Sequence, residues 1–314
     1  MSERNLVLAL SGGVGGAKLA LGLSHIVAPG NLLIVANTGD DFEHLGLSIS
    51  PDIDTLTYAL AGLDNKTLGW GRQDETWAFM ETLATIGGPT WFRLGDRDLA
   101  LHALRTQRLK AGETLAAITA DIASRLGITA SILPMSNDPV RTQVDSDEGL
   151  LDFQDYFVGR QCRPVVKSLR FAGADTATPH PDFLAALTSP RLRAIVICPS
   201  NPFISVEPIL ALPGVREAFA ARTAPVVAVS PIIGGKAVKG PTAKMMAELG
   251  IPPGAAAIAH RYGPLLDGYI LDSSDAAEAA GLAPRTLLTQ TLMTTLDDKI
   301  ALARITLDLA DALA

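Results

Sequence analysis

A chain of 314 residues with 48% hydrophobic residues can bury a substantial core, which excludes a disordered protein and fits one large α/β domain. The net charge of −7 argues against a nucleic-acid binder, which would present a basic face. Cys162 and Cys198 lie far apart, so we expect neither a disulfide framework nor a zinc site. No run reaches the ~20 apolar residues of a membrane span, and MSERNLVLAL lacks the pattern of a signal peptide. We therefore expect a cytoplasmic protein without a membrane partner.

Short apolar runs alternate with helical patterns along most of the chain. The strand candidates are residues 6–10, 32–36, 131–133, 194–198, 226–229 and 269–271. Helical stretches between them predict a Rossmann-like α/β fold, with a mostly parallel sheet covered by helices on both faces. Residues from about 50 to 127 show successive helical patterns, and polar alternation marks residues 140–174. We predict a single domain over residues 1–314, with a helical insertion at about 50–127 and a β-rich excursion at 140–174.

A glycine-rich stretch, LALSGGVGGAKL, joins the first strand to a helix expected from about residue 17 to residue 24. It is not a P-loop, because Leu19 stands where a hydroxyl would hold magnesium, and Lys18 replaces the third glycine of a dinucleotide fingerprint. Glycines let a ligand approach the backbone, and the N–H groups of a helix start favour an anion. We interpret the stretch as a phosphate cradle; the alternative is a turn that binds nothing. The candidate phosphate-binding residues are Gly12, Gly13, Gly15, Gly16 and Lys18.

An acidic stretch, NTGDDFEHLGLSISPDIDT, follows the second predicted strand. We interpret Asp52 as a residue that favours the dipole of the helix starting at Pro51. Asp54 lies off the apolar stripe of that helix, so we expect it to face the strand ends with Asp41 and to be unnecessary for the core. Mg²⁺ commonly uses one or two carboxylates plus substrate phosphates, so Asp41 and Asp54 predict a magnesium site. The alternative is solvated loop carboxylates.

Two further loops follow strand candidates and carry hydrogen-bond donors. CPSNPFIS is interpreted as a ligand loop or as a turn stiffened by its prolines, and SPIIGGKAVKGPTAKMM as a second phosphate contact or as a flexible exposed loop. The candidate phosphate-binding residues of these loops are Ser200, Asn201, Gly234, Gly235, Lys236 and Lys239.

A charged helix start lies in WFRLGDRD, within the predicted insertion. We interpret Asp96 or Asp98 as a helix cap, and Arg93, which precedes the cap, as a residue that can reach a ligand. All three tryptophans of the chain fall in this region. They fit either ordinary core or a pocket for a flat ring.

Taken in order, SGGVGGAKLALGL, NTGDD, SPDIDT, RLGDRD, PSNPFIS and SPIIGGKAVKGPTAKMM resemble the motifs of the 2-phospho-L-lactate transferase family of coenzyme F420 biosynthesis. The similarity runs from about residue 6 to about residue 300. It implies a magnesium-dependent, GDP-binding transferase of Rossmann-like fold that forms a homodimer. Such an enzyme moves a phosphorylated three-carbon acid from its GMP-activated diphosphate to the ribityl hydroxyl of the deazaflavin 7,8-didemethyl-8-hydroxy-5-deazariboflavin (Fo) and releases GMP. No residue discriminates phospholactate, phosphoenolpyruvate and phosphoglycerate.

The same resemblance implies roles for particular residues. By motif match, Asp54 and Arg93 are expected contacts of Fo, and Asp41 is an expected metal or active-site acid, so Asp41 and Asp54 are the candidate catalytic carboxylates. The glycine stretch and the loop at 230–241 are implied contacts of the nucleotide phosphates. QDYFVGRQCRP, residues 154–164, also resembles a family stretch but departs from it at Gly159 and Cys162, so its role stays open.

Two other functions fit parts of the sequence. A related group of the gluconeogenesis-factor type shares the sheet and the glycine loop but binds nucleotide sugars as a regulatory protein. The residues after the paired aspartates, Phe42 to His44, and the nearby SPDIDT favour the transferase. A nicotinamide dehydrogenase would require a ribose-binding acid near Asn37, where none stands.

Overall fold

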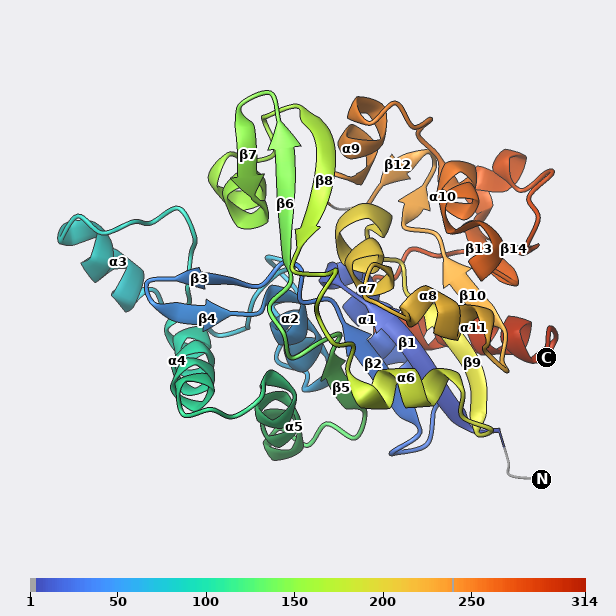
Figure 1. Cartoon of the computed structure of the whole chain (residues 1–314), viewed down its shortest axis with the longest axis horizontal. Coiled ribbons are helices and arrows are strands. Elements are labelled where there is room, and N and C mark those ends of the chain that lie inside the picture. The colour runs from blue at the N-terminus through green and yellow to red at the C-terminus, as the bar shows by residue number, and fades with distance from the viewer. Residues whose placement is uncertain (1–3, 239) are drawn as a thin grey trace.

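The computed structural model describes residues 4–238 and 240–314 and is built around a seven-stranded sheet (Figure 1). The strand order is β14-β13-β10-β9-β1-β2-β5, and every neighbouring pair is parallel. The bounds are Leu6–Ser11 (β1), Leu32–Ala36 (β2), Ser131–Pro134 (β5), Leu192–Ile197 (β9), Val226–Val229 (β10), Gly268–Asp272 (β13) and Arg285–Thr289 (β14). The predicted α/β fold with a mostly parallel sheet is confirmed, whereas the edge strand β14 was not predicted.

Both faces of the sheet are covered, and β1 shows this in its own sequence. Leu8 and Leu10 belong to one hydrophobic cluster, whereas Val7 and Ala9 belong to another on the opposite face. Such continuous burial is typical of a parallel strand between two helical layers. The second cluster includes α1 (Gly13–Ser24), α2 (Pro51–Leu60) and α11 (Leu296–Asp311); the first includes α6 (Pro181–Leu187), α7 (Glu207–Leu210), α8 (Val215–Ala220), α9 (Thr242–Glu248) and α10 (Ala255–Tyr262).

The connection from β2 to β5 carries the helices expected for the insertion. After α2 come α3 (Ala78–Thr85), α4 (Asp96–Lys110) and α5 (Leu115–Arg125). A separate small core of Ile49, Met80 and Leu94 lies under this region. In Figure 1, α3 and α4 lie to one side of the sheet, next to a hairpin of β3 (Phe42–His44) and β4 (Leu47–Ile49). This hairpin was not predicted, because its short strands lie within the polar and glycine-containing stretch 37–55.

The predicted β-rich excursion is a three-stranded antiparallel sheet. It consists of β6 (Arg141–Ser146), β7 (Gly149–Asp152) and β8 (Val166–Ala172), with β6 in the centre. A two-residue pairing of β11 (Ile232–Ile233) with β12 (Lys236–Ala237) forms a second small hairpin. Among the described residues, no helix combines the length and the apolar composition needed to cross a bilayer.

Helix α1 begins at Gly13, four residues before the predicted start. Gly13, Gly15 and Gly16 are therefore helical, and the lack of a side chain at Gly15 and Gly16 permits close packing. A Cβ on Gly15 would lie 2.4 Å from the carbonyl oxygen of Pro199, and one on Gly16 would lie 2.5 Å from the hydroxyls of Ser11 and Ser200. These glycines thus bring the helix start against the end of β1 and the turn after β9.

Candidate active site

A cavity of about 820 Å³ opens at the carboxyl ends of the parallel strands. The turns after β1, β2, β9 and β10 contribute to its wall, as does the segment of residues 291–293 after β14. The other wall comes from α2 beyond Asp52, from α4, from the segments that flank α3 and from residues 153–162. Open parallel sheets bind ligands at this edge, so this cavity is the candidate active site.

The predicted phosphate cradle forms part of the cavity wall. Gly12, Gly13, Gly15 and Lys18 line the cavity, whereas Gly16 is buried beneath it. The N–H of Gly12 donates to the Ser200 hydroxyl (3.1 Å), and the N–H of Gly13 donates to the Asp52 carboxylate (2.6 Å). The ammonium of Lys18 donates to the Met293 carbonyl (2.8 Å). A carboxylate thus occupies the helix start that we predicted for a phosphate.

Ser200 and Asn201 both line the cavity, as the sequence predicted. The Ser200 hydroxyl accepts from Gly12, while the Asn201 side-chain oxygen accepts from the N–H groups of Phe203 (2.9 Å) and Ile204 (3.4 Å). The contacts of Asn201 are those of a residue that caps the following turn.

The other predicted phosphate loop points its N–H groups elsewhere. Gly234 and Gly235 donate to the two oxygens of the buried Asp275 at 2.9 and 2.8 Å, and neither glycine lines the cavity. Lys236 is exposed and also lies outside the cavity wall. Lys239 falls outside the described residues.

Three acids lie close together at the sheet side of the cavity. Asp40 and Asp52 line it, whereas Asp41 lies behind them and accepts from the Ser50 hydroxyl (2.8 Å). One oxygen of Asp40 and one of Asp41 are buried without a hydrogen-bond partner. Burial raises the pKa of Asp41 to about 7 and that of Asp52 to about 6.

Burial, and then the charge of Asp52, raise the pKa of Asp40 well above its ordinary value. A side-chain hydrogen bond from Asn37 offsets part of this rise. The charges of Arg141 and Arg105 likewise offset part of the rise at Asp41. Burial outweighs these contacts, so the three sheet-side acids, Asp40, Asp41 and Asp52, all have raised pKa values.

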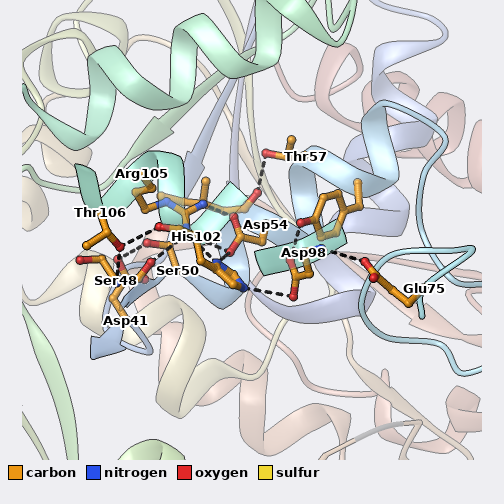
Figure 2. Close-up of polar contacts among 12 residues, drawn as sticks. Asp41, Ser48, Ser50, Asp54, Thr57, Glu75, Asp98, His102, Arg105 and Thr106 are labelled. Atoms are coloured by element: carbon orange, nitrogen blue, oxygen red, sulfur yellow. Dashed lines mark hydrogen bonds and ion pairs between the residues drawn. The ribbon is translucent and has the colours of Figure 1, made fainter. Parts of the chain in front are cut away.

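Asp54 lies in a different electrostatic environment. It lines the cavity, as predicted, but its two oxygens are bound by the guanidinium of Arg105, with Nη1 at 3.1 Å from Oδ2 and Nη2 on Oδ1 (Figure 2). Arg105 is fully buried and also donates to the Ser48 carbonyl (3.3 Å). The expectation that Asp54 is unnecessary for the core is therefore wrong, because its partner comes from α4, 51 residues along the chain.

Arg93 also lines the cavity, in an aromatic part of the wall. Its guanidinium lies 4.1 Å from the ring centre of Trp77. Trp70 and Trp91 line the cavity and are partly exposed, so two of the three tryptophans face a ligand-sized space.

Four functional candidates were missed in the sequence: Tyr58, Asp98, His102 and Arg105. The first three line the cavity, and all four belong to the polar network of Asp54. Figure 2 labels Asp98, His102 and Arg105 of this network. The i, i+4 spacing of Asp98 and His102 on one helix was an available signal. An acid at a helix start is also typical of a cap, so the spacing alone did not indicate a functional role.

The interpretation of Asp96 and Asp98 as caps of their own helix was wrong. Asp96 accepts from the N–H groups of Ala78 (3.0 Å) and Phe79 (3.0 Å), so it caps α3 instead. The start of α4 is capped by Glu75, which accepts from the N–H groups at positions 97 (2.7 Å) and 98 (2.9 Å). Asp96 of α4 thus caps α3, and Glu75 in the segment before α3 caps α4. Each cap is distant in the sequence from the helix start that it serves, so no local pattern reveals it.

Asp52 is a further missed residue. Besides Gly13 it accepts from the Asn37 side-chain amide (2.9 Å), which also donates to the Ile204 carbonyl (3.2 Å). From the first turn of α2, Asp52 therefore connects the turns after β1 and β2, and Asn37 extends this connection to the turn after β9.

The residues present also fit a magnesium ion. Partnerless buried carboxylate oxygens beside a cavity are hard oxygen donors of the kind that Mg²⁺ prefers. Within residues 4–238 and 240–314, no cluster of three or more His, Cys, Asp or Glu has the geometry of a complete metal site. A site of one or two carboxylates completed by substrate phosphates is consistent with that finding.

The sheet, the glycine-rich first turn and the cavity at the strand ends define an α/β protein that binds small ligands where its parallel strands end. The fold resembles that of a solved member of the UPF0052 family from Bacillus halodurans. The match covers 98% of this chain and 99% of that chain, with a TM-score of 0.66 and 16% identity. At that identity the likeness shows a shared fold alone.

The particular family follows from the sequence comparisons. A family model described as 2-phospho-L-lactate transferase CofD matches residues 7–300, and the chain belongs to this family of transferases. It is 42% identical over 316 residues to a phosphoenolpyruvate transferase of Streptomyces griseus, which covers 97% of this chain and 98% of that protein. It is 37% identical over 272 residues to a 2-phospho-L-lactate transferase of Methanosarcina mazei, with 87% and 88% covered. The resemblance that we drew from the motifs is confirmed.

Proposed function

We propose that this protein transfers a phosphorylated three-carbon acid from a GMP-activated diphosphate to the ribityl hydroxyl of the deazaflavin Fo, in the biosynthesis of coenzyme F420. One observation carries the proposal: a single cavity joins the phosphate cradle of the sheet to the aromatic and acidic wall of the insertion. That arrangement suits a reaction between a phosphate-rich donor and a flat acceptor. The family and the names of the relatives support the same reaction.

In the donor half, the start of α1 and Lys18 would hold the diphosphate. For this, Asp52 would exchange its contact with the Gly13 N–H for a cation or a proton, because a carboxylate and a phosphate repel each other at one helix start. Lys18 lies one turn further along the helix and would stabilise charge on the departing GMP.

In the acceptor half, Trp70 and Trp91 would flank the deazaflavin ring and Arg93 would contact its polar edge. Asp54, oriented by Arg105, would accept a hydrogen bond from the attacking ribityl hydroxyl and fix its position. The hydroxyl oxygen forms a bond to the phosphorus next to the three-carbon acid. The bond from that phosphorus to the GMP oxygen breaks, and the hydroxyl proton passes to a nearby carboxylate.

We propose magnesium as the cofactor, held by Asp52 and one further sheet-side acid, Asp40 or Asp41, and completed by substrate phosphates. This differs from the expected pair of Asp41 and Asp54, since both oxygens of Asp54 are already bound by Arg105. When bound, the ion would withdraw charge from the phosphoryl oxygens. The proposal extends to a homodimer in the cytoplasm, and the dimer is tested by light scattering of the purified protein.

One assay tests the function. The purified protein is incubated with Fo, Mg²⁺ and the guanylylated form of phospholactate, phosphoenolpyruvate or phosphoglycerate, and products are weighed by mass spectrometry. We expect GMP and a phosphodiester of Fo with at least one of the three donors. A protein that quenches no Fo fluorescence and releases no GMP would instead fit the nucleotide-sugar-binding regulatory alternative.

A further inference from the structure

Asp98 occupies the first turn of α4, yet its carboxylate does not serve the helix start. Glu75 accepts from the N–H groups there, so the usual task of an acid at this position is already fulfilled. The carboxylate of Asp98 is therefore available for another contact.

Two side chains hold this carboxylate in place. The Tyr58 hydroxyl donates to Oδ1. Nε2 of His102 lies 3.1 Å from Oδ2, an ion-pair contact that Figure 2 marks. On its other side, Nδ1 of His102 lies 3.4 Å from Nη1 of Arg105, which can only donate. His102 thus faces Asp98 with an Nε2–H group and accepts at Nδ1.

Asp98 is the most accessible member of this network. Its side chain is 18% exposed, against 2% for His102 and 7% for Asp54, and it lines the cavity together with Trp70, Trp91 and Arg93. Each carboxylate oxygen can accept two hydrogen bonds, and each has one of the contacts above, so each retains one acceptor position. A fixed acceptor therefore stands in the aromatic half of the cavity.

Asp98 also stays charged in this position. Burial acts to raise its pKa, but the contacts with His102 and Tyr58 and the charge of Arg105 outweigh burial, and the pKa of Asp98 is lowered. An ionised carboxylate accepts the stronger, charge-assisted type of hydrogen bond.

We propose that Asp98 is a specificity-determining residue for the acceptor: its carboxylate, oriented by Tyr58 and His102, accepts a hydrogen bond from an N–H or O–H group of a flat heteroaromatic substrate. This rests on the proposed function for the identity of that substrate. Tyr58 and His102 act as positioning residues. In Fo the donor is either the imide N–H of the ring or a hydroxyl of the ribityl chain.

The test measures the dissociation constant of Fo by fluorescence titration of the wild type and of Asp98→Asn. The amide keeps the shape of the carboxylate, and its oxygen can face Nε2 of His102 while its NH₂ group donates to the Tyr58 hydroxyl. We expect Asp98→Asn to weaken Fo at least about tenfold, because a charge-assisted contact is lost. The dissociation constant of GDP, measured in parallel, should stay unchanged.

Two variants serve as comparisons. Asp96→Asn alters a neighbouring acid that caps α3 and does not line the cavity, so Fo affinity should remain that of the wild type. Tyr58→Phe removes one donor to Asp98 but keeps the ring and the charge. Its Fo affinity should fall by a smaller factor than in Asp98→Asn.

Two Fo analogues identify the donor: one methylated at the ring imide nitrogen and one with an alkyl chain in place of the ribityl chain. With one analogue, the affinity ratio between wild type and Asp98→Asn should fall to about one, which names the donor. The proposal is overturned if Asp98→Asn binds Fo like the wild type, or if the ratio is the same for Fo and both analogues. A wild type that does not bind Fo would contradict the proposed function instead.

Discussion

The acids on the two walls of the cavity lie in different electrostatic environments. The sheet-side acids Asp40, Asp41 and Asp52 are crowded and buried with raised pKa values. None of them forms an ion pair among the described residues, and the charges of Arg141 and Arg105 only partly offset the effect of burial on Asp41. On the opposite wall, Asp54 is bound by Arg105, and Asp98 lies between Tyr58 and His102. The first set is incomplete until a cation or protons arrive, whereas the second is complete in the protein itself.

This difference assigns the walls to different ligands. Buried charges without partners are costly, which supports the proposal that the sheet side binds a cation and the phosphates that accompany it. The insertion side has satisfied its charges and offers oriented acceptors to a neutral ring. Each prediction below removes or exploits one part of that contrast.

The largest effect is expected for Arg105→Met. The substitution leaves Asp54 buried without its counter-charge, which typically costs about 3–5 kcal/mol of unfolding free energy. Urea denaturation measures it. Arg108→Met is the matched control on the same helix, because the pairs of Arg108 with Glu113 and Asp121 are screened by solvent and should contribute much less. Equal losses in both variants would show that the insertion side is no more dependent on its charges than the surface.

The next effect is a pH dependence of the magnesium-free protein. Asp41 and Asp52 have folded-state pKa values of about 7 and about 6, above the roughly 3.9 of an unfolded chain. The folded state therefore binds more protons, and its stability falls by several kcal/mol as the pH rises from about 4 to about 7.

A double variant isolates the contribution of Asp41 and Asp52 to the pH dependence of stability. His44 and His180, whose pKa values burial lowers, act in the opposite direction near pH 6, so the wild type is compared with an Asp41→Asn, Asp52→Asn double variant. Urea unfolding at several pH values should show a flatter profile for the variant, and saturating Mg²⁺ should flatten that of the wild type. Parallel profiles in the absence of metal would contradict the account of the sheet side.

Lys18→Ala should weaken GDP binding. Lys18 lines the donor half, and loss of a charge-assisted contact costs about 1.5–3 kcal/mol, roughly tenfold or more in the dissociation constant. Calorimetric titration with GDP measures it, with Fo affinity as the control. An unchanged GDP affinity would contradict the phosphate-binding role and leave Lys18 with a structural role, such as its contact with the Met293 carbonyl.

The smallest effect on stability is expected for Arg93→Ala. Its contact with the Trp77 ring is a partly exposed cation–π pair worth about 0.5–1 kcal/mol. Fo affinity should nevertheless fall clearly, since Arg93 lines the acceptor half. If the variant weakens GDP as much as Fo at an unchanged melting temperature, the assignment of the two walls is mistaken.

The sheet was predictable because its strands are short, fully apolar and separated by helices. Only the edge strand β14 of this sheet was not predicted, because its half-exposed sequence RTLLT is not a continuous apolar run. The cavity was predictable for a related reason: strand ends of a parallel sheet meet at one edge, so the loops that follow them converge.

The contacts within the cavity were not predictable in the same way. Periodicity placed Asp54 off the apolar stripe, but it could not show that Arg105 covers its charge from another helix. Likewise Gly234 and Gly235 look like a phosphate nest, and their N–H groups are taken by Asp275, 40 residues later. Pairings between distant segments depend on the packed fold and leave no local pattern.

The most direct test of the two-wall account is a pair of titrations on Asp52→Asn and Asp98→Asn, one with Mg²⁺ in the presence of saturating GDP and one with Fo. The account predicts that Asp52→Asn loses at least about tenfold in Mg²⁺ affinity and keeps its Fo affinity, and that Asp98→Asn shows the reverse. It is contradicted if each substitution weakens both ligands to the same extent while the fold remains intact.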